Sequence, residues 1–284
     1  MLDVMSQAKG AIEAYNDLLR ATSSNISNQS VTGFKRVQIS FQELFNHLLR
    51  APSAPDTQNN IGGTNPLQLG GGAAVSASTI DFTQGDLTNG TNLSLAIQGG
   101  GLFVISNDGG KTFKFTRSGD FTLNASKRVV TKTGAQVFGF KRAGGATATG
   151  SLVPIDLSGQ TFDATTVTWD NNGVLRASAD TNRTTFGAEL GFQIGLTTFA
   201  NPGGLQYTDG TSFIQTLASG EPATANAPGA AGLGTVSGAR LEQSNVFFIG
   251  ESIDALEAQR AMSGALTVIR LASDAISQFI NRIS

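Results

Sequence analysis

The chain has 284 residues, enough for two modest domains, and only 14% of them are charged, against about 25% in typical soluble domains. The formal net charge of -2 gives no electrostatic reason to expect nucleic acid or an anionic membrane as a partner. The absence of cysteine excludes disulfides, thiolate metal sites and cysteine nucleophiles.

Residues 1 to about 28 are predicted to form a helix, because their apolar side chains recur at alternating spacings of three and four. That spacing is the a/d pattern of a heptad repeat. The helix is expected to end near Ser27 and Asn28. The stripe also includes Thr22, and its predicted subunit-packing positions are Met5, Ala8, Ile12, Tyr15, Leu19 and Ile26.

The C-terminal segment mirrors this pattern, and its helix is expected to start near Ser252 with Asp254 in the first turn. Its stripe begins at Ala255, and the predicted subunit-packing positions are Ala258, Met262, Ala265, Ile269, Ala272, Ile276, Phe279 and Ile283. Two interpretations stay open for the two helices. They are either ordinary amphipathic helices on one globular core, or helices that pair with each other or with a neighbouring subunit.

The segment after the first helix is expected to be irregular. Residues 34–50 are mixed in character, and the pattern allows extended or partly helical structure. Residues 51–72 contain three prolines, several glycines and few apolar residues, which predicts a loop or linker. A loop of this length is unusual inside a compact domain, so we expect it to be functional or to pack against neighbours.

From about 73 to 235 short apolar runs alternate with turn residues, which predicts a glycine-rich all-β region. Turns are expected at 107–110 and 170–173, and a loop at 218–235. The predicted fold class is therefore α+β, with two heptad helices forming a coiled-coil-like core domain and a separate central β domain. The predicted strands lie at 93–97, 102–105, 113–117, 121–123, 129–130, 166–169, 173–176 and 192–199.

Catalytic chemistry finds little support in the sequence. His47 is the sole histidine, and the chain lacks the G-x-S-x-G elbow that would accompany a serine nucleophile. The segment Gly109–Thr112 lacks the first glycine of a phosphate-binding loop, because Ile105 stands there, and it falls between two predicted strands. No enzyme activity, metal or cofactor is expected.

No apolar run is long enough to predict a membrane-spanning helix. The N-terminus also lacks a basic region followed by an apolar run, so no cleavable secretion signal is expected. A route out of the cytoplasm would therefore have to be one that does not read such a signal.

Several motifs, in the same order along the chain, resemble those of the flagellar axial family of rod and hook proteins. The segment from Ser23 to Arg36 resembles its Asn-rich T-G-F-K signature, and 95–104 its L-A-I-x-G-x-G-F-F motif. Residues 115–121 are similar to Y-T-R-x-G-x-F, 241–246 to L-E-x-S-N-V, and 258–260 to A-Q-R. The motif residues are Asn25, Asn28, Gly33, Phe34, Lys35, Gly99, Gly101, Phe103, Arg117, Gly119, Phe121, Glu242, Ser244, Asn245, Gln259 and Arg260.

This resemblance implies a structural subunit of the flagellar rod that self-assembles into a helical tube, transmits torque and lines the export channel. The partners that it implies are further copies of this chain, neighbouring rod, hook and ring proteins, and the flagellar export apparatus. It also implies a place in the periplasm-spanning basal body. The length and the 42–72 segment resemble distal rod subunits, while a hook or proximal-rod subunit stays an alternative. The implied division is 1–33 and 236–284 for the axial core, 34–72 for a linker and rod-type loop, and 73–235 for the β domain.

Two other classes remain in competition. A β-rich secreted adhesin would explain the polar middle region but leaves the paired terminal heptads unexplained. A peptidoglycan-cleaving enzyme associated with the rod would need a catalytic glutamate or a metal cluster in a cleft, and no such motif is visible in the sequence.

Overall fold

The computed structural model describes residues 2–44, 47–54, 62–142, 151–160, 162–163, 166–178 and 186–283. The chain divides into two compact units. Unit 1 comprises Met1–Ile26, Val37–Thr79 and Phe247–Ser284, and unit 2 comprises Ser27–Arg36 and Ile80–Val246. The architecture is α+β, with a helix toward each end of the chain and a large β-rich region between them.

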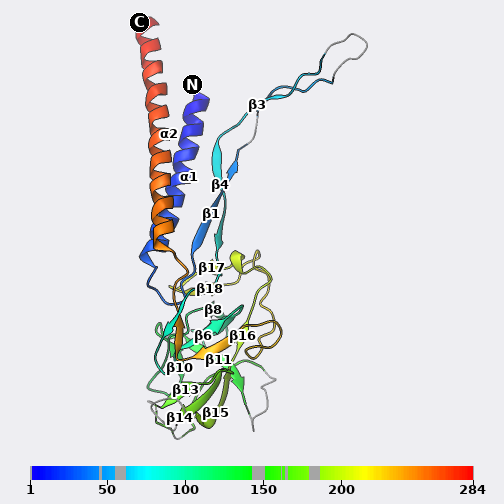
Figure 1. Cartoon of the computed structure of the whole chain (residues 1–284), viewed down its shortest axis with the longest axis vertical. Helices are drawn as coiled ribbons and strands as arrows, with labels where there is room; N and C mark the ends of the chain where they lie inside the picture. The colour runs from blue at the N-terminus through cyan, green and yellow to red at the C-terminus, as the bar shows by residue number, and fades with distance from the viewer. Residues whose placement is uncertain are drawn as a thin grey trace. The chain divides into compact units, whose positions relative to one another are not determined.

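Unit 1 contains the long helices α1 (Leu2–Ser27) and α2 (Phe248–Ile283), which run in opposite directions in Figure 1. The end of α1 meets the start of α2 where Asn25 Nδ2 donates to Glu251 Oε2 at 3.0 Å. The predicted end of α1 is confirmed. The predicted start of α2 near Ser252 is wrong by a full turn, because Ser252 lies inside the helix and its hydroxyl donates to the carbonyl oxygen of Phe248. The acidic residue of the first turn is accordingly Glu251, not Asp254.

Unit 1 also contains two pairs of strands. Strand β1 (Val37–Glu43) pairs with β4 (Ala73–Ile80), and β2 (His47–Arg50) pairs with β3 (Leu67–Leu69). The described parts of 34–50, namely 34–44 and 47–50, are thus extended and contain no helix. The prediction of a loop over 51–72 is wrong for β3, which pairs with β2. Ser53 and Thr64 form a further bridge between the same two segments. Backbone pairing thus forms a strand although the composition of these residues is not typical of one.

Among its described residues, unit 2 has a sheet of twelve strands whose main path runs β13-β14-β15-β11-β7-β8-β18-β17. Strand β7 (Leu102–Ser106) is buried along its whole length and lies centrally, between β11 (Gln136–Lys141) and β8 (Lys114–Thr116). Alternate residues of β7 supply two apolar clusters. Phe103 and Ile105 belong to one cluster, and Leu102 and Val104 to the other, as the two-residue period of a strand requires.

The other strands of this sheet are short, apart from β15, which has nine residues. They are β9 (Phe121–Leu123), β10 (Val129–Thr131), β12 (Val153–Pro154), β13 (Val167–Trp169), β14 (Val174–Ser178), β15 (Phe186–Ile194), β16 (Leu196–Thr197), β17 (Gln206–Tyr207) and β18 (Ser212–Ile214). A 3-10 helix, η1 (Pro202–Gly204), precedes β17. The predicted single strand over 192–199 is wrong, because it divides at Gly195 into β15 and β16, which pair with different neighbours.

Two further strand pairs join distant parts of unit 2. Strand β6 (Leu95–Gln98) pairs with β19 (Thr235–Gly238), and β5 (Leu87–Asn89) pairs with β20 (Arg240–Glu242). The predicted turns at 107–110 and 170–173 are confirmed as the connections β7–β8 and β13–β14.

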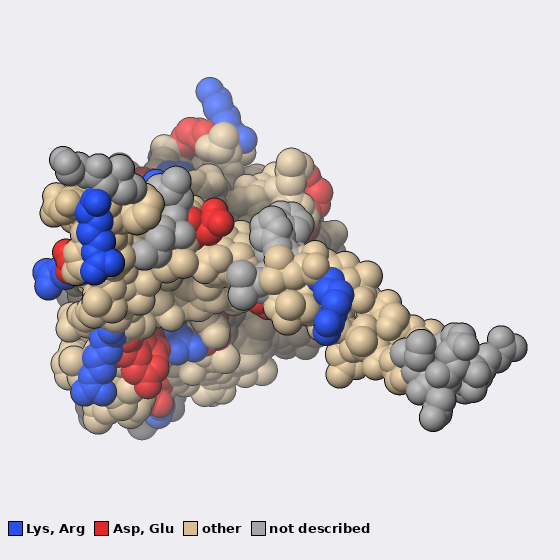
Figure 2. Space-filling model, turned by 90° about the horizontal axis from the view of Figure 1, so that it is seen from above, with Lys and Arg blue, Asp and Glu red and all other residues tan. Residues whose placement is uncertain are grey.

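The surface carries few charges. Most of the face drawn in Figure 2 is uncharged, and lysine, arginine, aspartate and glutamate are interspersed on it. Neither described helix has the length and apolar character needed to cross a membrane. Within the described ranges, no group of three or more His, Asp or Glu side chains is placed to hold a metal ion.

Candidate functional site

Four of the motif segments meet inside unit 2 around the carboxylate of Glu242. Glu242 ends β20, Arg117 directly follows β8, and Lys35 lies in the segment between α1 and β1. Their side chains are almost completely buried, with exposed fractions of 0% for Lys35 and Glu242 and 3% for Arg117. We call these three residues the Glu242 cluster.

Each oxygen of the Glu242 carboxylate accepts hydrogen bonds from buried donors. Oε1 accepts from the Lys35 ammonium at 2.7 Å and from the Gly85 amide at 3.0 Å. Oε2 accepts from Arg117 Nε at 2.5 Å. The backbone of Glu242 is held as well, since its carbonyl oxygen accepts from the Gly33 amide at 2.8 Å. Glu242 therefore joins segments from four separate regions of the sequence.

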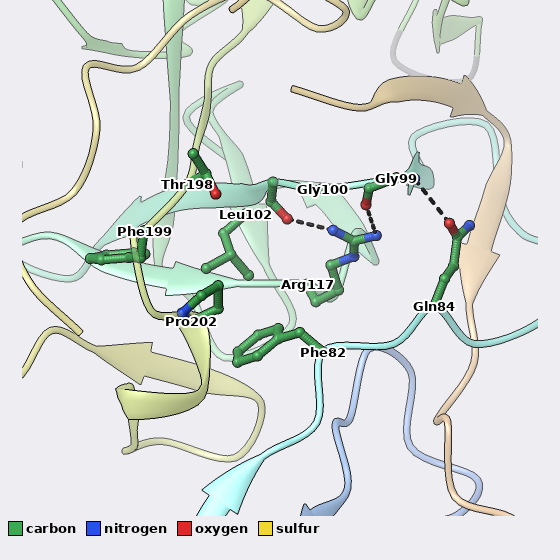
Figure 3. Close-up of a pocket in the computed structure, with 10 residues that line it drawn as sticks. Phe82, Gln84, Gly99, Gly100, Leu102, Arg117, Thr198, Phe199 and Pro202 are labelled. Atoms are coloured by element: carbon green, nitrogen blue, oxygen red, sulfur yellow. Dashed lines mark hydrogen bonds between the residues drawn. The ribbon is translucent and has the colours of Figure 1, made fainter. Parts of the chain in front are cut away.

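Arg117 links this carboxylate to the glycine-rich turn between β6 and β7 (Figure 3). Its Nη1 donates to the carbonyl oxygen of Gly101 at 2.5 Å, and its Nη2 donates to that of Gly99 at 2.6 Å. Nη2 also lies 3.3 Å from the carbonyl oxygen of Ile97. These carbonyl dipoles partly compensate the second positive charge, because the cluster holds two cations and one carboxylate.

Burial lowers the pKa of the Lys35 ammonium below its ordinary value, and the adjacent Glu242 carboxylate opposes that shift. Its Nζ also donates to the carbonyl oxygen of Thr83 at 2.6 Å. The Tyr207 hydroxyl accepts from the Lys35 amide at 2.9 Å and donates to the Lys35 carbonyl oxygen. Burial raises the pKa of the Tyr207 hydroxyl, so it stays a hydrogen-bond donor across the physiological range.

Two motif glycines allow the motif segments to approach closely. Gly33 has φ of 71°, and a Cβ there would lie 2.4 Å from the Ser118 amide nitrogen. A Cβ on Gly119 would lie 1.6 Å from the carbonyl oxygen of Leu95. Any side chain at either position would force these backbones apart, so both motifs require glycine for packing.

Asn245 fixes a second junction beside the cluster. Its side-chain oxygen accepts from the Arg36 amide at 2.8 Å, and its side-chain nitrogen donates to the carbonyl oxygens of Asp81 and Thr83 at 2.8 and 3.2 Å. Arg36 also pairs with the Asp81 carboxylate at 3.3 Å. The asparagine of the L-E-x-S-N-V motif thus connects the segment that contains Arg36 to the segment that contains Asp81 and Thr83.

The aromatic motif residues support the same region. Phe34 stacks on Tyr207 with ring centroids 5.6 Å apart, and Phe103 meets Phe121 edge to face at 5.1 Å. Both phenylalanines of the second pair belong to the larger apolar cluster of unit 2. These contacts add burial and specific ring geometry around the charged groups.

Asn25 occupies a comparable position in unit 1. Its side-chain nitrogen donates to the carbonyl oxygen of Val37 at 2.9 Å and to Glu251 Oε2 at 3.0 Å, while its oxygen accepts from the Val37 amide at 3.0 Å. Asn25 and Glu251 are both buried. One side chain near the end of α1 therefore fixes β1 and the first turn of α2.

The remaining motif residues are Asn28, Ser244, Gln259 and Arg260. Ser244 accepts from the Val246 amide at 3.3 Å, and the Asn28 carbonyl oxygen accepts from the Val31 amide. Gln259 and Arg260 are exposed on α2. The side chain of His47 lies outside the described residues.

The heptad positions follow a graded pattern of burial in unit 1. Ala8, Ala258 and Ala272 are buried, while Phe279 is 65% exposed and Ile283 has no described side chain. The other positions are partly buried: Met5, Ile12, Tyr15, Leu19, Ile26, Met262, Ala265, Ile269 and Ile276. Tyr15 contacts Phe41 of β1, with ring centroids 5.7 Å apart.

The sequence reasoning missed Tyr207, Gly85, Thr83 and Asp81, which complete the polar network. Tyr207 is one of only two tyrosines in the chain, yet nothing local marks it as the partner of Lys35. The charged groups of the Glu242 cluster bond to one another and to backbone, and they are closed to solvent. This arrangement suits a structural junction, because a substrate has no access to the carboxylate or the ammonium.

Comparisons with known proteins agree with the motifs. Residues 96–177 match the family model described as the flagellar hook protein FlgE/F/G D1 domain. The flagellar basal-body rod protein FlgG of Bacillus subtilis is 28% identical over 99% of both chains, and that of Caulobacter vibrioides is 31% identical over 92% of this chain and 91% of its own. The hook protein FlgE of Helicobacter pylori is 36% identical over 52% of this chain but only 20% of its own.

These names describe structural parts of the flagellum, which confirms the prediction of a structural protein and not an enzyme. The match to rod proteins extends over 99% of the chain for the Bacillus subtilis protein and 92% for the Caulobacter vibrioides protein. The chain belongs to the family of flagellar basal-body rod and hook proteins.

Proposed function

We propose that this chain is a distal rod subunit that assembles into a helical tube in the basal body. The observation that carries this proposal is the near-complete alignment with rod proteins, from 91% to 99% of their length, against 20% of the Helicobacter pylori hook protein.

The exposed apolar side chains of α2 support assembly through the helices of unit 1. Large side chains are about half exposed or more at Ile253, Leu256, Leu266, Leu271, Phe279 and Ile280. At about 100° per residue these positions are distributed around the helix, and Phe279 lies on the predicted heptad stripe. Exposed apolar surface of this extent is typical of a region that a partner covers, so we propose that helices of neighbouring subunits bury it in a coiled-coil-like core.

The β2–β3 hairpin supports the same assembly. A two-stranded hairpin is marginally stable alone in water, and this one exposes Leu48, Leu49 and Leu67 by 54%, 62% and 52%. We propose that neighbouring subunits cover it and that it stiffens the tube. This proposal includes torque transmission, lining of the export channel and contacts with rod, hook and ring proteins. It also includes export through the flagellar apparatus.

The experiment is electron microscopy of concentrated purified protein and of a variant that lacks residues 255–284. The full chain should form straight tubes, whereas the truncated chain should form none. Its Trp169 emission should match that of the full chain, because Trp169 is buried in unit 2. Curved tubes would favour a hook-type subunit, and tubes formed by the truncated chain would contradict assembly through α2.

A point substitution separates assembly from folding. Ile269→Asp places a charge on the predicted stripe and should abolish tubes, while Gln278→Asp, at an exposed polar position of the same helix, should not. Neither substitution should shift the unfolding of unit 2 followed by Trp169. A substantial shift for Ile269→Asp would mean that α2 is part of one globular core.

A further inference from the structure

Unit 2 contains an apolar pocket of about 230 Å³ beside the glycine-rich turn between β6 and β7 (Figure 3). Its apolar walls are formed by Phe82, Leu102, Phe199 and Pro202, and Gly100 also lines it. We call it the Phe199 pocket. It is smaller than the about 300–1,000 Å³ typical of small-molecule sites, and its size suits inserted side chains better than a cofactor.

Two of the three polar side chains that line the pocket, Gln84 and Arg117, already have partners inside unit 2, and the third is the hydroxyl of Thr198. Gln84 accepts from the Gly99 amide at 2.9 Å through its oxygen, and its nitrogen lies 3.3 Å from the carbonyl oxygen of Ile97. Arg117 donates through Nε, Nη1 and Nη2 to Glu242 and to backbone carbonyl oxygens. A ligand that needed these groups would have to break those bonds, so the pocket favours an apolar occupant.

A rigid apolar projection lies on the same unit. Leu217 is fully exposed at the tip of a turn in which the Thr216 amide donates to Ser219 Oγ at 2.9 Å and the Ser219 amide donates to Thr216 Oγ1 at 3.2 Å. The turn is tied to η1, because Thr216 Oγ1 donates to the Gly204 carbonyl oxygen at 2.6 Å and Asn201 Nδ2 donates to that of Ala218 at 3.0 Å. Little conformational entropy would therefore be lost when Leu217 is buried.

We propose that Leu217 of one subunit inserts into the Phe199 pocket of a second copy of this chain. The turn that carries Leu217 is anchored on both sides of Pro202, which forms one wall of the pocket, so projection and pocket share one region of unit 2. Leu217 is fully exposed and does not fill the pocket of its own subunit. The two features can therefore meet only between copies of the chain. This inference rests on the proposed self-assembly.

The absence of cysteine allows a direct test by disulfide trapping. Gly100→Cys places a thiol at the pocket, and a Cβ there meets nothing within 4 Å. Gly159→Cys is the matched control, since its Cβ also meets nothing and it lies outside the pocket in unit 2. Concentrated Leu217→Cys chain mixed with the Gly100→Cys chain and a mild oxidant should crosslink about tenfold faster than with the Gly159→Cys chain, because docking raises the local thiol concentration.

The outcomes are distinct. Equal rates for the two mixtures would overturn the proposal, whether or not tubes form. Faster trapping of Gly100→Cys with Phe248→Cys than with Leu217→Cys would assign the pocket to a different apolar side chain and would also overturn it. If tubes fail to form but the selective crosslink appears, the contact stands and the proposed rod assembly fails.

A second readout uses the tubes. Leu217→Ser should raise the critical concentration for assembly by about tenfold, since the buried leucine is lost at each contact. The urea midpoint of Trp169 emission should not change, because Leu217 makes no buried contact in the monomer. An unchanged critical concentration would contradict the contact.

Discussion

Replacing Glu242 with glutamine tests whether the buried charge cluster holds unit 2 together. The substitution keeps the shape of the side chain but removes the carboxylate that bonds to both Lys35 and Arg117. It also replaces one acceptor oxygen with an amide nitrogen. In the native protein both Oε1 and Oε2 accept hydrogen bonds. At least one buried donor thus loses its acceptor, and two cations lose their counter-charge.

Breaking a buried ion pair by removing one partner costs about 3–5 kcal/mol, which is a large share of the about 5–15 kcal/mol total stability of typical domains. Trp169 is the only tryptophan, it is 2% exposed, and its indole donates to the Leu93 carbonyl oxygen at 2.9 Å. Its fluorescence therefore reports the unfolding of unit 2. Urea titrations of Glu242→Gln should show a midpoint lowered by about 1–3 M.

A matched surface variant gives the scale of an exposed pair. Lys9 and Glu13 form an i,i+4 pair with side chains 74% and 66% exposed, so Glu13→Gln should cost no more than about 0.5 kcal/mol by helix circular dichroism. The double variant Lys35→Met with Glu242→Gln should lose less stability than the sum of the single variants. A loss below about 1 kcal/mol for Glu242→Gln would show that water reaches the cluster, and the reasoning above would be wrong.

Three further predictions concern other contacts. Gly119→Ala should destabilise unit 2 by several kcal/mol, whereas Gly100→Ala should be nearly neutral in the same Trp169 assay, because only the first Cβ meets backbone. Asn25→Ala should lower the thermal midpoint of the helices in circular dichroism without moving the Trp169 transition, since its three hydrogen bonds lie in unit 1. Hydrogen bonds from Ser158 and Arg128 lower the pKa of Asp156 to about 2. Because this folded pKa lies below the unfolded value, the contribution is present above about pH 4 and is lost as the pH falls toward 2. Asp156→Asn should therefore flatten that part of the stability curve, and an unchanged curve would contradict it.

The helices were the most predictable part of the fold, because their information is local. The heptad spacing extends through α1 and α2, and Ser27 lies at the observed end of α1. The start of α2 was missed because Phe247 and Phe248 do not look like capping residues. The helix nevertheless begins at Phe248, where the Glu251 amide already bonds to the Phe247 carbonyl oxygen.

The strands were predictable where a hairpin joins neighbours and not where partners lie far apart. The β7–β8 and β13–β14 hairpins carry their turn signals between the strands. By contrast, β20 is only three residues long and pairs with β5, about 150 positions earlier, as the register of Leu241 with Thr88 shows. No local pattern marks such a pair, because its stability comes from the contacts that it makes in the folded unit.

The motifs identified most of the residues of the Glu242 cluster but not their connections. Lys35 and Glu242 are separated by 207 positions, and Arg117 and Glu242 by 125. The resemblance named all three residues, and only the fold shows that they share one carboxylate. Tyr207 carries no motif at all, and its role depends on where β17 lies against the Lys35 backbone.

The cluster also gives the long-range pairing of unit 2 a single register. Glu242 lies opposite Leu87 in the β20–β5 pair, with its carboxylate turned to the two cations. A shift of β20 by one residue would turn Glu242 to the opposite face and leave Lys35 and Arg117 buried without a counter-charge. An apolar residue at this position would tolerate the shifted pairing much better, because an apolar contact depends less on direction than a hydrogen bond does. We infer that the charged groups are placed here for specificity, since buried ion pairs add little net stability over apolar residues of similar size.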